Sequence, residues 1–484
     1  MDHVVRRAGW ILCLAAGSAV AQTASPPTHP NPDTQALRRE IAAMRAEYEA
    51  RIQALEKRVQ AAEAAAAASP PNATAAAPAA TAPAATTATA APTGGGSAAG
   101  GGFQPALSLI LSGAYYNSSQ DPATYRIRGF SLPPDAAIGP GVRGFSLAES
   151  ELGLAANIDP WFRGAANLSF APDNTVSVEE AYVETTSLGH GLNLRAGRFF
   201  SNIGYLNPQH AHAWDFADAP LAYQAMLGTQ FDDDGVRLTW LAPTEQFIEL
   251  SAEAGRGRSY PGSDTSHNAP GMYTLAAHNA PGMYTLAAHT GGDIGDSSSW
   301  RAGLSYLHAH AGDQELLAFD PAGKEIRNRF AGSTGVWIAD AVWKWAPNGN
   351  ATRTNFKLQG EYLQSRRDGS MVVDTAGAAS PGDYRATQSG WYLQGVYQFM
   401  PHWRFGLRTE RLSPGTPDYG SNSGLVAQDS GSPSKNTLML DWSPSEFSRW
   451  RFQLAQDRAR AGAADTQWLI QYQMSLGAHG AHSY

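Results

Sequence analysis

Two short histidine pairs are the residues best suited to chemistry in this 484-residue chain. His210 and His212 are followed by Asp215, and the same form recurs at His308 and His310. Residues i and i+2 of an extended segment point the same way, so each pair could present two imidazoles and a nearby carboxylate to one ion such as zinc. Two ligands do not complete a zinc shell, so ordinary polar loop residues remain the alternative.

Further histidines occur in an 11-residue duplication. The segment HNAPGMYTLAA stands at residues 267–277 and again at 278–288, which adds His267 and His278. External loops tolerate such insertions well, so we interpret the duplication as recent slippage and not as a metal site.

The composition excludes several classes of protein. Lys+Arg 35 against Asp+Glu 43 gives a net charge of −8, which argues against a nucleic-acid partner. Beyond the first residues there is no stretch of about 18 apolar residues, which excludes a helical membrane bundle. No G-x-S-x-G, phosphate-loop or H-E-x-x-H motif is present, so we expect no enzyme and no catalytic residues.

The first residues have the pattern of an export signal. Arg6 and Arg7 precede a short apolar run, and an A-x-A site ends at Ala21. This predicts a signal peptide over residues 1–21, because the apolar run is too short for the alternative of an anchor helix. We therefore expect a bacterial envelope protein that has lost its single cysteine, Cys13, on cleavage.

Two further segments precede the folded unit. Residues 33–63 carry apolar residues at steps of three and four among Arg and Glu, which predicts a periplasmic coiled coil that self-associates. A single helix lying on another surface is the alternative. Residues 64–102 are rich in Ala, Pro, Thr and Gly and predict a linker. The fold should begin near Phe103.

From Phe103 onward the hydrophobic period changes to two. Trp337, Ala339 and Ala341 share one face, for example, with Asp340 on the other. Similar alternation occurs near residues 107–112, 151–158, 391–399 and 467–476. Each run predicts a strand of about 10 residues that is apolar on one side and polar on the other. A soluble β-sandwich also alternates, so this pattern alone does not decide the fold.

The connections favour a membrane barrel over a sandwich. Seven tight turns are expected at residues 159–161, 187–191, 242–244, 296–299, 346–349, 400–402 and 443–445, mostly separated by longer loops. Short turns on one rim and long loops on the other are typical of outer-membrane barrels, and the count predicts about 16 strands. The fold class is therefore an all-β, transmembrane antiparallel barrel over residues 103–484. Closure satisfies every backbone group in lipid, and the wide interior encloses water.

The order signal, coiled coil, linker and barrel resembles the phosphate-selective porin family. The run VEEAYVETTSLGHGLNLRAGRFFSNIGYLN at 178–207 is similar to that family's strand-turn-strand, and Arg195 and Arg198 match its basic segment. The family's lysine-rich ladder is missing from this chain, so the resemblance does not extend to phosphate specificity.

A second resemblance covers roughly residues 146–307. The stretches QHAHAWDFADAPLAYQAMLG and DDDGVRLTWLAPTEQFIEL resemble a proteobacterial group labelled zinc-regulated TonB-dependent outer-membrane receptors. Such receptors resemble 22-stranded barrels with a globular plug. The segment before Phe103 leaves no room for a plug, so this chain departs from the receptor pattern.

Residues 202–232 form the third long loop, which folds into the lumen of general porins. By that analogy we expect a constriction, and its residues, together with those of the basic segment, are Arg195, Arg198, His210, His212, Asp215, Asp218 and Asp232. An ordinary surface loop is the alternative. Strand parity assigns a mixed set of charges to the lumen, namely Arg163, Arg195, Arg237, Arg301, Lys357, Arg404, Arg408, Arg451, Glu151, Glu249, Glu253, Glu361, Glu410 and Asp457.

Three functions fit these features. The first is a trimeric outer-membrane porin of a Gram-negative bacterium, contacting lipid and admitting small hydrophilic solutes or ions. The second is a metal uptake protein whose His-x-His pairs concentrate zinc, the one cofactor that the residues suggest. The third is a structural tether acting through the helix at 33–63.

Overall fold

The computed structural model describes residues 105–263, 282–374 and 380–477. All of them belong to one compact unit, Ala98–Tyr484. Several predicted features lie outside the described residues: the signal peptide, the coiled coil at 33–63, the linker at 64–102, His267 and His278.

The described chain consists mainly of strands. Their bounds are β1 Ala106–Ser118, β2 Gly144–Leu147, β3 Ser150–Asn157, β4 Phe162–Phe170, β5 Val176–Thr185, β6 Leu192–Phe200, β7 Asp232–Leu241, β8 Phe247–Gly255, β9 Met283–Ile294, β10 Ser298–Phe319, β11 Glu325–Trp345, β12 Asn355–Asp374, β13 Ser380–Met400, β14 Trp403–Ser413, β15 Ser434–Ser445, β16 Ser448–Asp457 and β17 Asp465–Gly477. The helices are short: η1 Pro122–Thr124, η2 Ala211–Ala213, α2 Leu221–Leu227, η3 Pro347–Gly349 and η4 Gly420–Asn422. Within the described residues, no helix has the length and apolar character needed to cross a bilayer.

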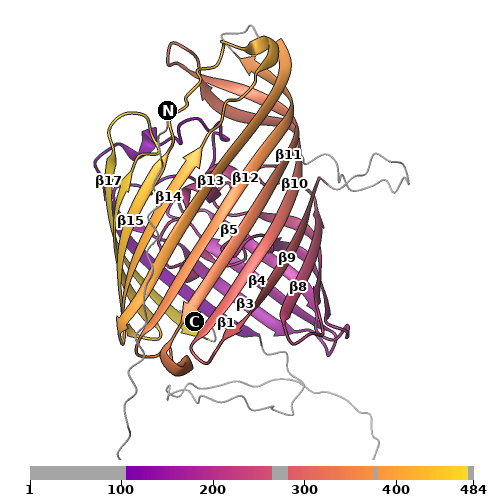
Figure 1. Ribbon diagram of the computed structural model, residues 1–484, viewed down its shortest axis with the longest axis vertical. Helices are drawn as coiled ribbons and strands as arrows, with labels where there is room; N and C mark the ends of the chain where they lie inside the picture. The colour runs from indigo at the N-terminus through magenta and orange to yellow at the C-terminus, as the bar shows by residue number, and fades with distance from the viewer. Residues whose placement is uncertain (1–104, 264–281, 375–379, 478–484) are drawn as a thin grey trace, which may run out of the picture. The chain divides into compact units, whose positions relative to one another are not determined.

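The strands form one closed antiparallel barrel (Figure 1). From β3 to β17 each strand pairs with the next one in sequence, and β1 closes the sheet by pairing with β17, as in Ser108 opposite Gly477. Both β2 and β3 pair with β1 and together occupy one position in the wall, so the seventeen segments make sixteen barrel strands. This confirms the predicted fold class and strand number.

Residue alternation along each strand separates an apolar outside from a polar inside. In β14, Leu407 is 50% exposed on the outer face, whereas the next residue, Arg408, is 1% exposed and points into the barrel. Trp337 of β11 and Trp391 of β13 are likewise exposed outside. Because the sheet closes on itself, its backbone groups are paired and its outer side chains can contact hydrocarbon.

The two rims differ in their connections. The rim where β1 begins and β17 ends has short turns. Six of the seven predicted turns lie where expected. The seventh turn was predicted at residues 443–445 but lies at Glu446 and Phe447, because β15 continues through Pro444 to Ser445. The other rim has the long loops, and β10 to β13 extend beyond their neighbours there (Figure 1).

The longest of these loops, residues 201–231 (loop L3), folds back against the inner wall. It carries η2 and α2, and all seven residues of α2 are buried. Their apolar side chains pack with Ile338, Leu363 and Tyr392 of the wall and with residues of the loop between β1 and β2 (loop L1, residues 119–143). The inside of the barrel therefore has a packed core, and L3 is held in a fixed position there.

Candidate functional site

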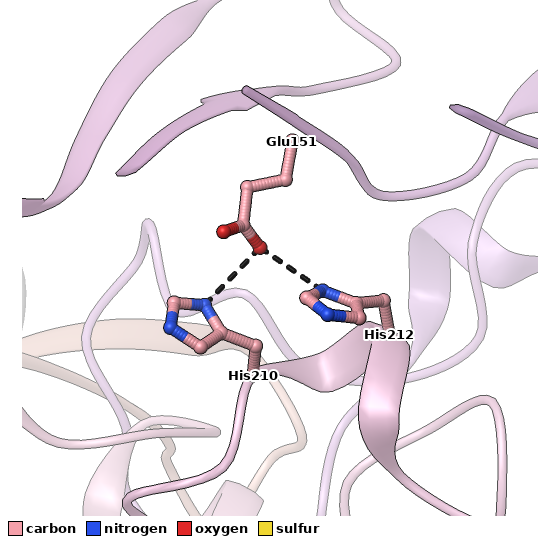
Figure 2. Close-up of side chains that lie close together, drawn as sticks. All are labelled: Glu151, His210 and His212. Carbon is pink, nitrogen blue, oxygen red and sulfur yellow. Dashed lines mark ion pairs between the residues drawn. The ribbon is translucent and has the colours of Figure 1, made fainter. Parts of the chain in front are cut away.

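The two histidines of L3 converge on one carboxylate from the wall. The Oε2 atom of Glu151, in β3, lies 3.1 Å from Nδ1 of His210 and 3.0 Å from Nδ1 of His212. Figure 2 shows the carboxyl group of Glu151 pointing between the two rings. The rings stack with centroids 5.5 Å apart, although their segment is a 3₁₀ turn and not the extended chain that the sequence predicted.

Further carboxylates surround this pair. Nδ1 of His210 lies 3.3 Å from Oε2 of Glu179, and its Nε2 lies 3.0 Å from Oε2 of Glu180. Donor atoms of Glu149, Glu151 and Glu179 also lie within 4.8 Å of one another, as do those of Glu151, His210 and His212. We call Glu149, Glu151, Glu179, His210 and His212 the Glu–His cluster.

A bulge in β5 brings two consecutive glutamates to the cluster. Asn167 of β4 pairs with Glu180, but the next residue, Leu168, pairs with Val178, so Glu179 is an extra residue in the ladder. Without a bulge, successive residues of a strand point to opposite faces, and one glutamate would contact lipid. The dipeptide Glu179-Glu180 was thus the sequence signal that could have revealed these carboxylates, which our residue assignment missed.

The cluster stabilises positive charge. Burial alone would lower the pKa of His210, but hydrogen bonds to Glu151, Glu179 and Glu180 outweigh burial and raise this pKa well above its ordinary value. Several carboxylates around one imidazole therefore favour either a proton on the ring or another cation at the same place.

Asp215 does not join the histidines, contrary to the expected His-x-His-plus-carboxylate arrangement. It contacts Lys357 Nζ and lies 3.3 Å from Nη1 of Arg404, on the wall formed by β12 and β14. Asp218 lies 2.9 Å from Arg408 and 2.6 Å from Lys435. Burial opposes ionisation of both aspartates, but these cations more than offset it and lower both pKa values. Both residues therefore anchor L3 to the wall.

The other predicted pore residues form separate ion pairs. Arg195 binds Glu184 at 2.7 Å, and Arg198 binds Asp234 at 2.7 Å. Asp232 is the first residue of β7 and contacts Arg258. Of the charges that parity assigned to the lumen, eight are buried inside the barrel: Arg237, Arg408, Arg451, Glu151, Glu253, Glu361, Glu410 and Asp457.

The second histidine pair has a different location from the first. His308 and His310 lie within β10 and not in a loop, and they alternate with the buried residues Leu307 and Ala309. The ring of His308 stacks on Tyr284 with centroids 5.0 Å apart. Both histidines therefore lie on the outer face, and neither belongs to a group of metal-competent donors among the described residues. The expected loop location of this pair is therefore wrong, because the alternation of β10 places both side chains on the outer face.

Two cavities meet the Glu–His cluster from different directions. A cavity of about 840 Å³ is lined by His210 and His212 together with the short turns around Ser299 and Gly349, and we call it the short-turn cavity. A cavity of about 560 Å³ is lined by Glu149 and Glu179 together with L1, and we call it the long-loop cavity. The cluster thus lies where the two cavities approach each other beside L3.

A closed sixteen-stranded barrel with an apolar outside, a charged inside and a loop packed in its interior is a transmembrane β-barrel with the architecture of a porin. The chain is 30% identical over 351 residues to a protein of Aquifex aeolicus (strain VF5) described as uncharacterized, covering 71% of this chain and 70% of that one. It belongs to the same family as that protein. No family model matches the chain.

Solved structures with a similar barrel come from several bacteria. OmpT of Vibrio cholerae has 10% identity and a TM-score of 0.45, covering 77% of this chain and 97% of that one. The outer-membrane channel DcaP of Acinetobacter baumannii has 12% identity and a TM-score of 0.45, covering 78% and 98%. An anion-selective porin from Comamonas acidovorans has 10% identity and a TM-score of 0.44, covering 78% and 100%.

Proposed function

We propose that the protein is a porin of the Gram-negative outer membrane, through which small hydrophilic solutes or ions diffuse passively. The observation that carries the proposal is the charged interior of a closed sixteen-stranded barrel, with cavities of about 840 and 560 Å³ beside L3. A barrel of this width is too wide for side chains from its wall alone to fill. A porin also needs an outer surface that is stable in lipid, and the apolar outer face of this barrel provides one.

The charged side chains of the interior are of both signs and do not form a ring of one charge. Acidic and basic side chains pair across the wall and with L3, as in Asp441 with Arg404 at 2.6 Å and with Arg451 at 2.9 Å. A ring of like charge would select one sign of ion strongly. We therefore propose weak ion selectivity, and membership of the phosphate-selective porin group without a strong phosphate preference.

Reconstitution in a planar bilayer tests the proposal directly. The purified mature chain should give stepwise, TonB-independent conductance, and the reversal potential in a salt gradient should lie near zero. A protein that is folded, as judged by its altered migration on an unboiled gel, but electrically silent would contradict the porin proposal. A large reversal potential would contradict weak selectivity alone.

We further propose a homotrimer, supported by the predicted apolar seam at 33–63. Chemical cross-linking in detergent should give a species of three chains. Deleting residues 22–102 should weaken this assembly if the helix contributes to it, whereas an unchanged trimer would place the contacts on the barrel alone. The same deletion tests the tether alternative, since loss of envelope integrity with an intact trimer would favour a tether.

A further inference from the structure

We infer that Glu151, His210 and His212 bind one divalent transition-metal ion of the zinc class beside L3, where the two interior cavities approach each other. Binding itself depends only on the geometry of these residues. Its consequence for transport, an ion that obstructs the passage, rests on the proposed porin function.

The spacing of the donor atoms suits a small ion. Donors held 2.0–2.1 Å from a tetrahedral zinc lie about 3.3 Å from one another. Oε2 of Glu151 lies 3.1 and 3.0 Å from the Nδ1 atoms of His210 and His212, and the three donor atoms all lie within 4.8 Å. Glu179 Oε2, 3.3 Å from the same Nδ1 of His210, can supply a fourth ligand. Small adjustments of the side chains would therefore complete the shell.

The chemistry of the donors selects the class of ion. Two imidazoles with one or two carboxylates suit zinc, cobalt or nickel, whereas calcium and magnesium prefer oxygen ligands alone. The excess of carboxylates in the cluster also favours a compensating cation. A divalent ion would offset two negative charges among Glu149, Glu151 and Glu179, whereas a single imidazolium offsets one.

Groups behind the ligands hold them in place. Nε2 of His210 lies 3.0 Å from Glu180, so the ring can donate its proton there and keep Nδ1 as a ligand. Glu180 is fixed in turn by the backbone N–H of Phe200, which donates to its Oε1 at 3.1 Å. Arg449 donates to the carbonyl oxygen of His212 at 2.8 Å and positions the second histidine. Metal ligands in proteins commonly have such carboxylate–histidine support.

The cavities supply access to the ion. His210 and His212 line the short-turn cavity, and Glu149 and Glu179 line the long-loop cavity. An ion arriving by either cavity reaches ligands that are already oriented. An ion held beside L3 would narrow the passage, so zinc should reduce the current in proportion to its occupancy.

Cobalt and zinc binding to the purified chain test the site. The mature protein, made without a histidine tag, should bind one Co²⁺ per chain with the visible absorption bands of a tetrahedral complex, and Zn²⁺ should displace it in calorimetry. His210→Gln combined with His212→Gln should weaken binding at least 100-fold. Absence of saturable binding in the folded wild-type protein would overturn the inference, as would full binding by this double variant.

Two further variants make the result specific. His308→Gln combined with His310→Gln is the matched control, since this pair has the same spacing but lies on the outer face, and its Co²⁺ binding should equal the wild type. Glu180→Gln keeps every ligand and removes only the support of His210, so it should weaken binding by roughly 10-fold or more and change the cobalt spectrum. Unchanged cobalt binding by the Glu180→Gln protein would contradict the proposed support of His210 by Glu180.

Conductance separates this inference from the porin proposal. Micromolar Zn²⁺ should reduce the single-channel current of the wild type but not that of the His210/His212 variant. Metal binding by an electrically silent barrel would support the metal site and contradict the porin proposal. Conductance in a protein that binds no cobalt would support the porin proposal and contradict the metal site.

Discussion

Asp218 shows how single charges attach L3 to the wall. Its carboxylate contacts Arg408 and Lys435, whose side chains are only 2% and 4% exposed. Removing one partner of a buried ion pair is costly because the remaining charges lose compensation away from water. The residual partners are Glu410, 2.7 Å from Arg408, and Asp457, 3.7 Å from Lys435.

Replacing Asp218 by Asn should therefore lower the free energy of unfolding by about 3 kcal/mol at neutral pH. The cost should depend on pH in a defined direction. The pKa of Asp218 lies below its ordinary value of 3.8, so its contribution is complete above that value and is lost as the pH falls through the lower folded pKa. Thermal unfolding of both proteins from pH 7 to pH 3 measures the difference, which should shrink below about pH 4.

A matched control exists on the surface of the barrel. Asp368 pairs with Arg385 at 3.0 Å, but the two side chains are 50% and 67% exposed. Asp368→Asn should cost under about 1 kcal/mol. Equal effects of the two substitutions, or a difference that persists unchanged at pH 3, would contradict the role given to Asp218.

At the scale of elements, L3 is organised around one carboxylate of the wall. Glu361 of β12 accepts hydrogen bonds from the backbone N–H of Leu206 at 3.0 Å and from the hydroxyls of Tyr223 and Tyr392 at 2.7 and 2.6 Å. These donors come from the start of L3, from α2 and from β13. A single buried acceptor therefore fixes the loop against two neighbouring strands.

Glu361→Leu should release this part of L3, because buried donors that lose their acceptor are left unsatisfied. We expect a loss of roughly 3 kcal/mol in stability, together with larger and noisier single-channel conductance in a planar bilayer. Glu315→Leu is the control, since Glu315 pairs with the exposed Arg327 and should leave the conductance unchanged. Unchanged conductance in the Glu361 variant would show that L3 does not limit the passage.

For the whole molecule, an outer face in lipid and an interior in water should differ in their access to water-soluble reagents. This prediction can be tested without knowing which solute the barrel transports. The sequence contains one cysteine, Cys13, within the predicted signal peptide, so new cysteines report on their own surroundings. In lipid vesicles, Leu407→Cys should resist a charged maleimide because it faces hydrocarbon. Ser299→Cys should react, since Ser299 lines the short-turn cavity.

Mass spectrometry after brief labelling measures both reactions. Dissolving the vesicles in detergent and unfolding the protein in urea should make the two cysteines react at the same rate. This step controls for differences in the intrinsic reactivity of the two thiols. Equal labelling in intact vesicles would contradict the assignment of the outer face to lipid.

Much of the fold could be predicted because the polarity of each strand residue depends only on whether its side chain faces lipid or water. A strand whose neighbours alternate between lipid and water must alternate in polarity, so runs such as Trp337 to Trp345 reveal their two faces without any knowledge of distant contacts. Tight turns add the strand number, which the closed barrel confirms. The misplaced turn at 443–445 shows the limit of the rule, because Pro444 lies at a register irregularity within β15 and does not end the strand.

The site was less predictable because it depends on how L3 crosses the interior. The His-x-His spacing identified His210 and His212, but it did not reveal that Asp215 contacts Lys357 or that Glu151 of β3 lies against the two rings. The sequence alone determined a barrel with an apolar outside and a charged inside, since those demands are local. Only the tertiary structure decided which of these charges meet, because contacts across the barrel depend on the path of L3 and on the bulge at Glu179.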